Sequence, residues 1–249
     1  MMSSDDEREL RSYGRRRGRK GSSRQEALKR DLLPRVALDL TAPSGRLPVG
    51  KSEGAAQDLS APSGRLPAGE SEGAAQIWLE IGFGGGEHLV WQAKHNPGVS
   101  LIGCEPFEDG VVKVLSAIEE DRLENVRVHM GDARDVLRWL TPASVSRAFI
   151  LFPDPWPKRK HRKRRLVNPA TLKLLARIMK PGAELRIGTD IGDYARTMLQ
   201  AFRVQSDFAW QAESPADWRI RAPDWPQTRY EQKAEREGRR RYYFRFLRV

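Results

Sequence analysis

Four acidic residues fall at the ends of apolar segments that predict β-strands: Glu80, Glu105, Asp132 and Asp154. Ligands of open α/β sheets bind beside the carboxyl ends of the strands, so we expect these carboxylates to line one site. Asp154 stands between Pro153 and Pro155. Because proline fixes φ at about −65°, this setting predicts a rigidly held carboxylate. Each acidic residue alone could be a loop charge, and Asp132 could instead cap the helix that follows it.

Three glycines at alternate positions follow the first of these segments, in EIGFGGG: Gly82, Gly84 and Gly86. Glycine allows a sharp turn and a close approach of the backbone to a ligand. A dinucleotide-binding loop would carry its third glycine where Glu87 stands, and a carboxylate there would repel a diphosphate. The loop therefore favours a nucleoside ligand without a diphosphate, and Glu105 could accept hydrogen bonds from both ribose hydroxyls of such a ligand. A glycine turn with a purely structural use is the alternative.

The elements that position these residues are predicted to alternate between strand and helix. Apolar runs predict strands at 77–82, 99–106, 125–131, 146–154 and 183–190, and helical patterns lie between them at 87–96, 107–121, 168–180 and, after the last strand, 191–204. This alternation is typical of a Rossmann-like α/β fold, in which a mostly parallel central sheet carries helices on both faces. Two alternating runs, at 207–213 and 240–249, predict further strands, with an antiparallel strand at the C-terminal edge of the sheet.

The chain is predicted to have three parts. Residues 1–38 form a basic arm around RSYGRRRGRK that is partly disordered, and this arm either orders on a phosphate backbone or is a solvated tail. Residues 39–76 contain two successive 19-residue copies, DLTAPSGRLPVGKSEGAAQ and DLSAPSGRLPAGESEGAAQ. Their content of Pro, Gly, Ser and Ala predicts a flexible spacer. Residues 77–249 are predicted to form the folded domain.

The charge of the chain points to a polyanionic partner. Its 249 residues include 44 Lys and Arg against 33 Asp and Glu, which leaves a net charge of +11. The segment KRKHRKRR at 158–165 follows Asp154 directly, where cations could neutralise the phosphates of a nucleic acid. A charge run is more often a solvated face, but this position at the end of a strand favours binding.

Composition also argues against several classes of protein. A single cysteine, Cys104, rules out a disulfide within the chain and a cysteine-rich zinc site, and the four histidines show no metal-ligand spacing. No apolar run approaches the roughly 18 residues that span a bilayer. The opening segment MMSSDDEREL lacks the apolar core of a secretory signal, so we expect a cytoplasmic protein.

Five segments together resemble the bacterial tRNA (guanine-N7-)-methyltransferase family: LEIGFGGGEHL, IGCEPF, LFPDPWPKRKHRKRR, GTD and TRYEQKA. The resemblance covers residues 77–249 and the RSYGRRRGR arm, whereas the repeat at 39–76 departs from the family pattern. It implies S-adenosylmethionine as cofactor, tRNA as partner, and methylation of guanosine N7 at position 46 of the variable loop. It implies neither a metal nor an obligate protein partner.

The resemblance also implies roles for individual residues. The cofactor site would be lined by Glu80, Gly82, Gly84, Gly86, Glu105, Asp132 and Asp154, of which Asp154 would also be catalytic. The substrate would be contacted by Lys158, Asp190, Thr228, Arg229, Tyr230 and Glu231. The RNA would meet Lys160, His161, Arg162, Lys163, Arg164 and Arg165.

The residue types suit this chemistry. Guanine N7 carries a lone pair and no proton, so alignment matters more than a general base. Positive charge develops on the purine during the displacement, and the fixed carboxylate of Asp154 could stabilise it. Asp190 and Glu231 could accept hydrogen bonds from the guanine edge, and Trp156 could either stack on a base or simply pack. The rival hypotheses are a non-catalytic RNA-binding module and an NAD-dependent oxidoreductase, the latter disfavoured by Glu87.

Overall fold

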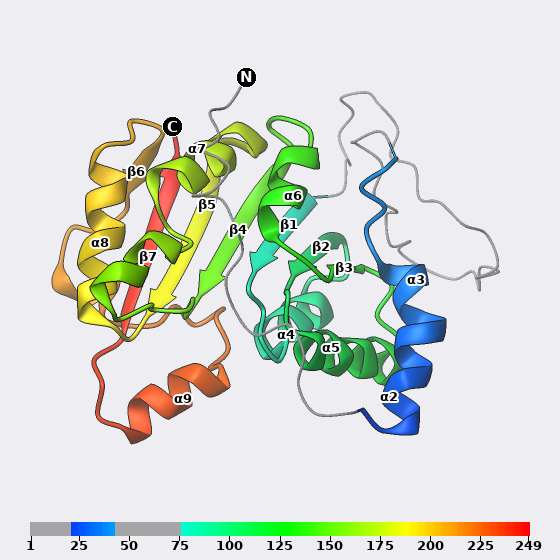
Figure 1. Cartoon of the computed structure of the whole chain (residues 1–249). Helices are drawn as coiled ribbons and strands as arrows, with labels where there is room; N and C mark the ends of the chain where they lie inside the picture. Colours follow the sequence, from blue (N-terminus) through cyan, green and yellow to red (C-terminus); the bar gives the residue numbers. More distant parts are fainter. Residues whose placement is uncertain (1–20, 43–75) are drawn as a thin grey trace.

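A seven-stranded sheet forms the centre of the computed structural model, which describes residues 21–42 and 76–249 (Figure 1). Its strands are β1 (Gln76–Ile81), β2 (Val99–Cys104), β3 (Val126–His129), β4 (Val145–Leu151), β5 (Met179–Thr189), β6 (Phe208–Trp210) and β7 (Tyr242–Arg248). They lie in the order β3-β2-β1-β4-β5-β7-β6. Strands β1 to β5 are mutually parallel, whereas β7 is antiparallel to both β5 and β6. The predicted fold class is confirmed.

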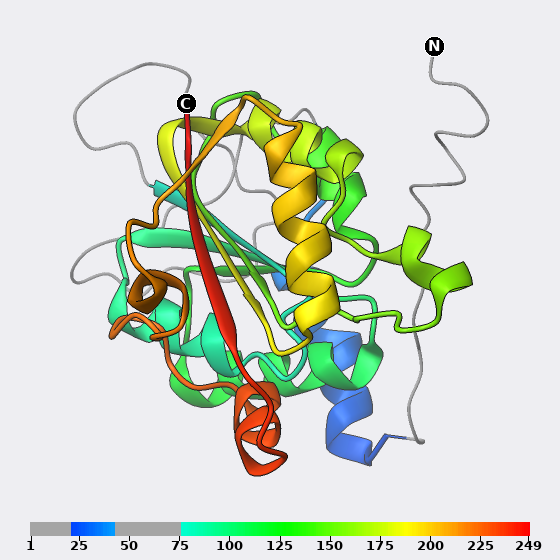
Figure 2. The same ribbon diagram turned by 90° about the vertical axis from the view of Figure 1, so that its left-hand side faces the viewer.

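Both faces of the sheet are buried under helices, as the nearly continuous apolar strands require. Helices α4 (Glu87–His95) and α5 (Glu108–Asp121) cover one face, and α6 (Ala133–Trp139), α7 (Pro169–Ile178) and α8 (Gly192–Arg203) cover the other (Figures 1 and 2). Chain order reverses between β1 and β4, which is the switch point where ligands of such sheets bind. The fold therefore directs attention to the carboxyl ends of these two strands.

The boundary between α7 and β5 differs from the sequence prediction. We expected the helix to continue to Lys180 and stop at Pro181, but it ends at Ile178 and β5 already begins at Met179. Met179 pairs with Val145 of β4, and the register of that pair shifts before Arg147. Sheet pairing thus takes over these residues before the proline could end the helix.

Residues 23–36 of the predicted basic arm are helical. They form α2 (Ser23–Ala27), the π-helical turn η1 (Leu28–Leu32) and α3 (Leu33–Val36). Ser22 begins this segment with a capping box, in which its hydroxyl and the Gln25 side chain each accept a hydrogen bond from the other residue's backbone N–H. Leu28 and Val36 are buried in the core on the α5 side of the sheet. The remainder of the arm and nearly all of the repeat, residues 1–20 and 43–75, lie outside the described residues.

The C-terminal segment returns across the open end of the sheet. After β6 the chain passes through η3 (Pro215–Trp218) to α9 (Arg229–Arg236), which lies beyond the carboxyl ends of the central strands (Figure 1). The α9 helix was not predicted as a helix, although Thr228 and Glu231 form its cap. Among the helices of residues 21–42 and 76–249, none is long and apolar enough to cross a membrane.

Candidate active site

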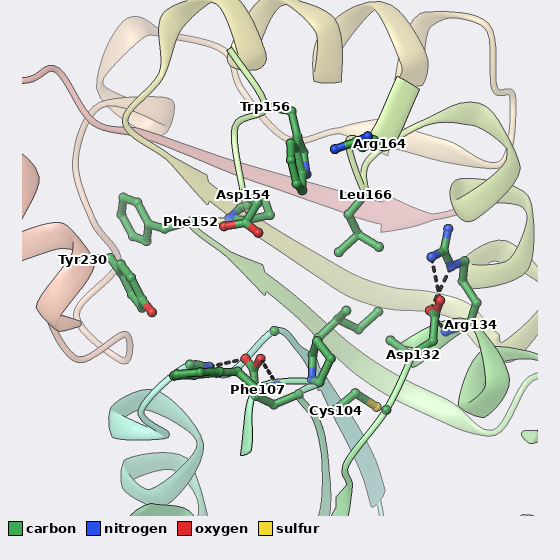
Figure 3. Close-up of a pocket in the computed structure, with 18 residues that line it drawn as sticks. Cys104, Phe107, Asp132, Arg134, Phe152, Asp154, Trp156, Arg164, Leu166 and Tyr230 are labelled. Carbon is green, nitrogen blue, oxygen red and sulfur yellow. Dashed lines mark hydrogen bonds and ion pairs between the residues drawn. The ribbon is translucent and has the colours of Figure 1, made fainter. Parts of the chain in front are cut away.

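A cavity of about 360 Å³ opens at the carboxyl ends of β1, β2 and β4 (Figure 3). It brings together six side chains that the sequence singled out: Glu105, Asp132, Asp154, Trp156, Arg164 and Tyr230. Gly82 and Gly84 form part of its wall, whereas Gly86 lies behind it at the start of α4. In Figure 3, Asp154 and Tyr230 approach the cavity from different elements, the β4 end and α9.

The glycine loop fixes the carboxylate of Glu105. Gly84 has a φ of +57°, which favours glycine, and its N–H donates to Glu105 Oε2 at 2.8 Å. The N–H of Phe107 donates to the other oxygen, Oε1, at 2.9 Å. Burial raises the pKa of Glu105, against the opposing effect of these two N–H groups. The result is a preset carboxylate on the cavity wall, which suits a ligand with a diol.

Asp132 is both the cap of α6 and part of the cavity wall. Its Oδ1 accepts hydrogen bonds from the N–H and Nε of Arg134 at 3.0 and 2.8 Å, and the guanidinium also reaches Oδ2 at 2.6 Å. The structure therefore shows both positions that the sequence offered as alternatives, the helix cap and the cavity wall. Arg134, which the sequence did not single out, offsets the charge of this carboxylate beside the cavity (Figure 3).

The loop that carries Asp154 has a strained backbone on either side of it. Phe152 and Trp156 adopt positive φ values, +51° and +42°. Each such conformation costs on the order of 1 kcal/mol or more and is typical of functional sites. The N–H of Phe152 donates to the carbonyl of Gly188 at 2.7 Å, which ties the loop to β5. Partial desolvation raises the pKa of Asp154.

Glu80 lies apart from these residues. It is 3% exposed and does not line the cavity; its Oε2 accepts a hydrogen bond from His88 Nδ1 at 2.7 Å. Gln92 in turn reaches His88 Nε2 at 3.1 Å and donates to the carbonyl of Asp224 at 2.8 Å. This buried chain links the glycine loop to the segment before α9. Nothing in the spacing of His88 and Gln92 marked these two residues as partners of Glu80.

Of the four residues of the TRYE segment at 228–231, one lines the cavity and the others make contacts outside it. Thr228 caps α9 through the N–H of Glu231. Glu231 is buried, and its Oε1 accepts hydrogen bonds from the hydroxyl of Tyr243 at 2.6 Å and from Arg221 Nε at 3.0 Å. Tyr230 alone of the four lines the cavity, while Arg229 pairs with Glu87 at 2.7 Å. Glu231 therefore holds α9 to β7 in this arrangement.

The remaining predicted substrate residues lie outside the cavity wall. Asp190 forms an ion pair with Arg239 at 2.9 Å. Lys158 is exposed at the start of η2 (Arg159–Arg164), the turn that carries most of the cationic run. In Figure 2 this turn projects from the edge of the molecule.

The cationic run has an exposed part and a buried part. Lys160, Arg162 and Lys163 are exposed, and Arg164 lies over the ring of Trp156, 4.9 Å from its centroid, on the cavity wall. The ring of His161 meets the edge of the same tryptophan at 5.9 Å between centroids. The buried member is Arg165, which differs from the surface contact expected from the sequence because its guanidinium is enclosed by neighbouring protein groups. Within the described residues, no group of three or more His, Cys, Asp or Glu could hold a metal ion.

This sheet, with a partly acidic cavity at its switch point, defines a class I methyltransferase, a class whose methyl donor is S-adenosylmethionine. A family model described as "Putative methyltransferase" matches residues 74–244. The crystal structure of TrmN from Thermus thermophilus shares the fold with a TM-score of 0.50 at 14% identity, over 70% of this chain and 44% of that one.

Relatives with higher sequence identity show which family of methyltransferases the chain belongs to. A tRNA (guanine-N(7)-)-methyltransferase of Ruegeria pomeroyi is 54% identical over 174 residues, which cover 70% of this chain and 73% of the relative. A protein of the same name from Nitrobacter hamburgensis is 44% identical over 236 residues, covering 95% of this chain and 86% of the relative. The chain belongs to the tRNA (guanine-N7-)-methyltransferase family.

Proposed function

We propose that this protein transfers the methyl group of S-adenosylmethionine to N7 of a guanosine in tRNA, at position 46 of the variable loop. The observation that carries the proposal is the meeting of Glu105 and Asp154 on one cavity in a chain of this family. We further propose that the protein works in the cytoplasm, as one domain over residues 77–249 preceded by a spacer and a basic arm.

The cavity suits the cofactor. Its volume of about 360 Å³ is in the range of small-molecule sites. Glu105, already oriented by Gly84 and Phe107, can accept hydrogen bonds from a ribose diol. The carboxylates of Glu105 and Asp154 favour a cationic ligand, and when bound S-adenosylmethionine supplies a methyl group on a positively charged sulfur. Glu80, Gly86 and Asp132 support this site from behind or from its rim, in our proposal.

Asp154 is the catalytic residue we assign. No proton has to leave guanine N7, so the carboxylate has no need to act as a base. Its fixed negative charge stabilises the positive charge that develops on the purine, and this electrostatic effect requires that the group be held in place beforehand. The strained, proline-bounded loop supplies that fixed position.

Recognition of the substrate is assigned to the groups around this carboxylate. Tyr230 and Trp156 offer aromatic faces to the guanine, since base stacking on aromatic rings is worth about 1–3 kcal/mol per base. We also assign substrate recognition to five residues around the cavity: Lys158, Asp190, Thr228, Arg229 and Glu231. Of these, Thr228 and Glu231 act indirectly, because they fix the position of α9. Lys160, His161, Arg162, Lys163 and Arg164 are assigned to the RNA backbone.

Incubation with tritiated S-adenosylmethionine and unmodified tRNA tests the proposal. We expect tritium in the tRNA fraction. Cofactor binding without transfer to any RNA would favour the non-catalytic module instead, and quenching of tryptophan fluorescence by NADH would favour the oxidoreductase.

A further inference from the structure

Arg165 is a buried cation directly behind the loop that carries Asp154. It is 2% exposed. Its Nε donates to the carbonyl of Pro155 at 2.9 Å, one guanidinium nitrogen donates to Thr197 Oγ1 at 2.7 Å, and the other donates to Asp193 Oδ2 at 2.6 Å. Its guanidinium also lies 4.7 Å from the centroid of the Tyr194 ring. Three of these four partners belong to the first turns of α8, and the fourth is the residue after Asp154.

A fixed partner of this kind matters because of the sequence around Asp154. Pro153, Pro155 and Pro157 have no amide hydrogen, so these residues cannot donate backbone hydrogen bonds to the sheet. Regular pairing of β4 ends at Leu151, and the N–H of Phe152 makes the next bond to β5. Beyond that point the carbonyl of Pro155 is held by Arg165, which follows ten residues later in the same connection between β4 and α7.

Packing alone does not explain why an arginine is buried at position 165. Burying a guanidinium has a desolvation cost of several kcal/mol, and an apolar residue of similar volume often serves stability as well or better. An apolar residue could not supply hydrogen bonds of fixed geometry. The planar guanidinium does, because its rigid fork of N–H groups holds several acceptors at once. Here the fork joins the Asp154 loop to two acceptors on α8, Asp193 and Thr197.

Asp193 connects this buried group to the surface. Its Oδ2 accepts from Arg165, and its Oδ1 lies 3.1 Å from the guanidinium of Arg162 in the exposed part of the run. The bond from Arg165 is the largest cause that holds the pKa of Asp193 below its ordinary value. One carboxylate thus joins a surface cation to the group that braces the catalytic loop.

We propose that Arg165 is a positioning residue for methyl transfer, which holds the carbonyl of Pro155 and thereby orients the carboxylate of Asp154. The proposal rests on the proposed catalytic role of Asp154. It assigns Arg165 a task different from the phosphate contact that its place in the cationic run suggested. A displacement of about 1 Å at a reacting group can lower a rate on the order of a hundredfold. Loss of the hydrogen bond from Arg165 to Pro155 should therefore slow methyl transfer.

The test compares Arg165→Lys with Arg177→Lys. Arg177 also holds backbone carbonyls with its guanidinium, those of Leu137 and Leu140, but it lies on α7 away from the cavity. For each variant we would measure kcat and the KM for tRNA at saturating cofactor, the dissociation constant of S-adenosylmethionine by calorimetry, and the thermal midpoint. The lysine keeps the charge but cannot reproduce the fork.

We expect Arg165→Lys to lower kcat by about tenfold or more, with the KM for tRNA and the cofactor dissociation constant changed by no more than about twofold. Arg177→Lys should lower the thermal midpoint and leave kcat unchanged. A raised KM for tRNA with unchanged kcat would assign Arg165 to RNA binding and overturn the proposal. An unchanged kcat with a lowered midpoint would also overturn it, since the role would then be structural.

A double-mutant cycle separates this proposal from the role of Asp154 itself. In an Asp154→Asn background, Arg165→Lys should lower the residual rate by less than about twofold, because residues that act through each other are not additive. Full additivity would mean that Arg165 acts elsewhere. An active Asp154→Asn enzyme would instead overturn the role of Asp154. If Arg165→Lys does not fold, Thr197→Val removes one acceptor of the fork, and we expect a smaller loss of kcat of about threefold with unchanged KM; no loss would overturn the proposal.

Discussion

The ring of Tyr230 lies against the backbone of Gly84. A Cβ atom on Gly84 would stand 2.8 Å from Cε2 of Tyr230 and 3.1 Å from its hydroxyl oxygen. One residue further on, the guanidinium of Arg229 fills the space beside Gly85 and pairs with Glu87. The α9 helix, which carries the proposed substrate residues, is therefore in contact with the glycine loop of the proposed cofactor site. This contact explains why the loop needs glycine beyond the requirement of a turn.

Substitution of Gly84 should weaken cofactor binding. Gly84→Ala combines a strained φ of +57° with a clash against Tyr230, whereas Gly82→Ala has a φ of +75° but open space around the added Cβ. We expect a larger loss of affinity for S-adenosylmethionine in Gly84→Ala, by about tenfold or more, in calorimetric titrations. Gly98→Ala is the control, because its Cβ meets nothing within 4 Å and its φ is ordinary. Equal affinities in all three variants would contradict the close approach.

Removal of the Asp154 side chain should separate binding from chemistry. We expect Asp154→Ala to lose methyl transfer by about a hundredfold or more, as when one preorganised electrostatic group is deleted. The affinity for tRNA in a filter-binding assay should persist, because the exposed cations lie on η2 and not in the β4 loop. An active alanine variant would remove Asp154 from the proposed mechanism.

Partial desolvation of Asp154 predicts an effect of pH on both rate and stability. Desolvation raises its pKa above the ordinary value of 3.8, and the ionised form is the one that stabilises the purine cation. The rate should therefore rise with pH through this raised pKa and lose that dependence in Asp154→Asn. Above it, the charged form costs more in the folded than in the unfolded chain, so Asp154→Asn should have the higher thermal midpoint at neutral pH. Below the pKa values of Asp154 in the folded and the unfolded chain, the thermal midpoints of the unmodified protein and the variant should converge. A lower midpoint for Asp154→Asn at neutral pH would show that ionised Asp154 stabilises the fold, contrary to this prediction.

Neutralising the exposed part of the cationic run should change the dependence of tRNA binding on salt. We expect the triple variant Lys160→Gln, Arg162→Gln and Lys163→Gln to bind tRNA more weakly, with a salt slope reduced by about one for each lost phosphate contact. Lys180→Gln, an exposed lysine near the amino end of β5, is the control. A slope equal to that of the unmodified protein would identify the run as a solvated face.

The sequence predicted the parts of this fold that depend on local pattern. Alternating apolar segments identified the strands. The rule for parallel sheets predicted that Glu80, Glu105, Asp132 and Asp154 would line one site, and the last three do, whereas Glu80 does not line the cavity. Helices that depend on packing were harder to predict. The segment Leu28–Leu32 is helical because Leu28 fills the core beside α5, and the surrounding cationic arm hides that signal.

Pairings between distant residues could not be predicted. Arg164 and Arg165 are adjacent and chemically identical, yet Arg164 lies on the cavity wall while Arg165 is enclosed by α8. The same holds for Glu231, whose partner Tyr243 lies on another element. Such differences arise from the packing of elements, which leaves no trace in the composition of a charge run.

Nucleoside mass spectrometry tests the central claim most directly. Unmodified tRNA would be incubated with the protein and S-adenosylmethionine, digested to nucleosides and, in parallel, cut into fragments to locate any new methyl group. We predict 7-methylguanosine in a fragment from the variable loop, with none formed by Asp154→Ala. Methylation of another base or another atom, or a cofactor that binds without any methylated nucleoside appearing, would contradict the account.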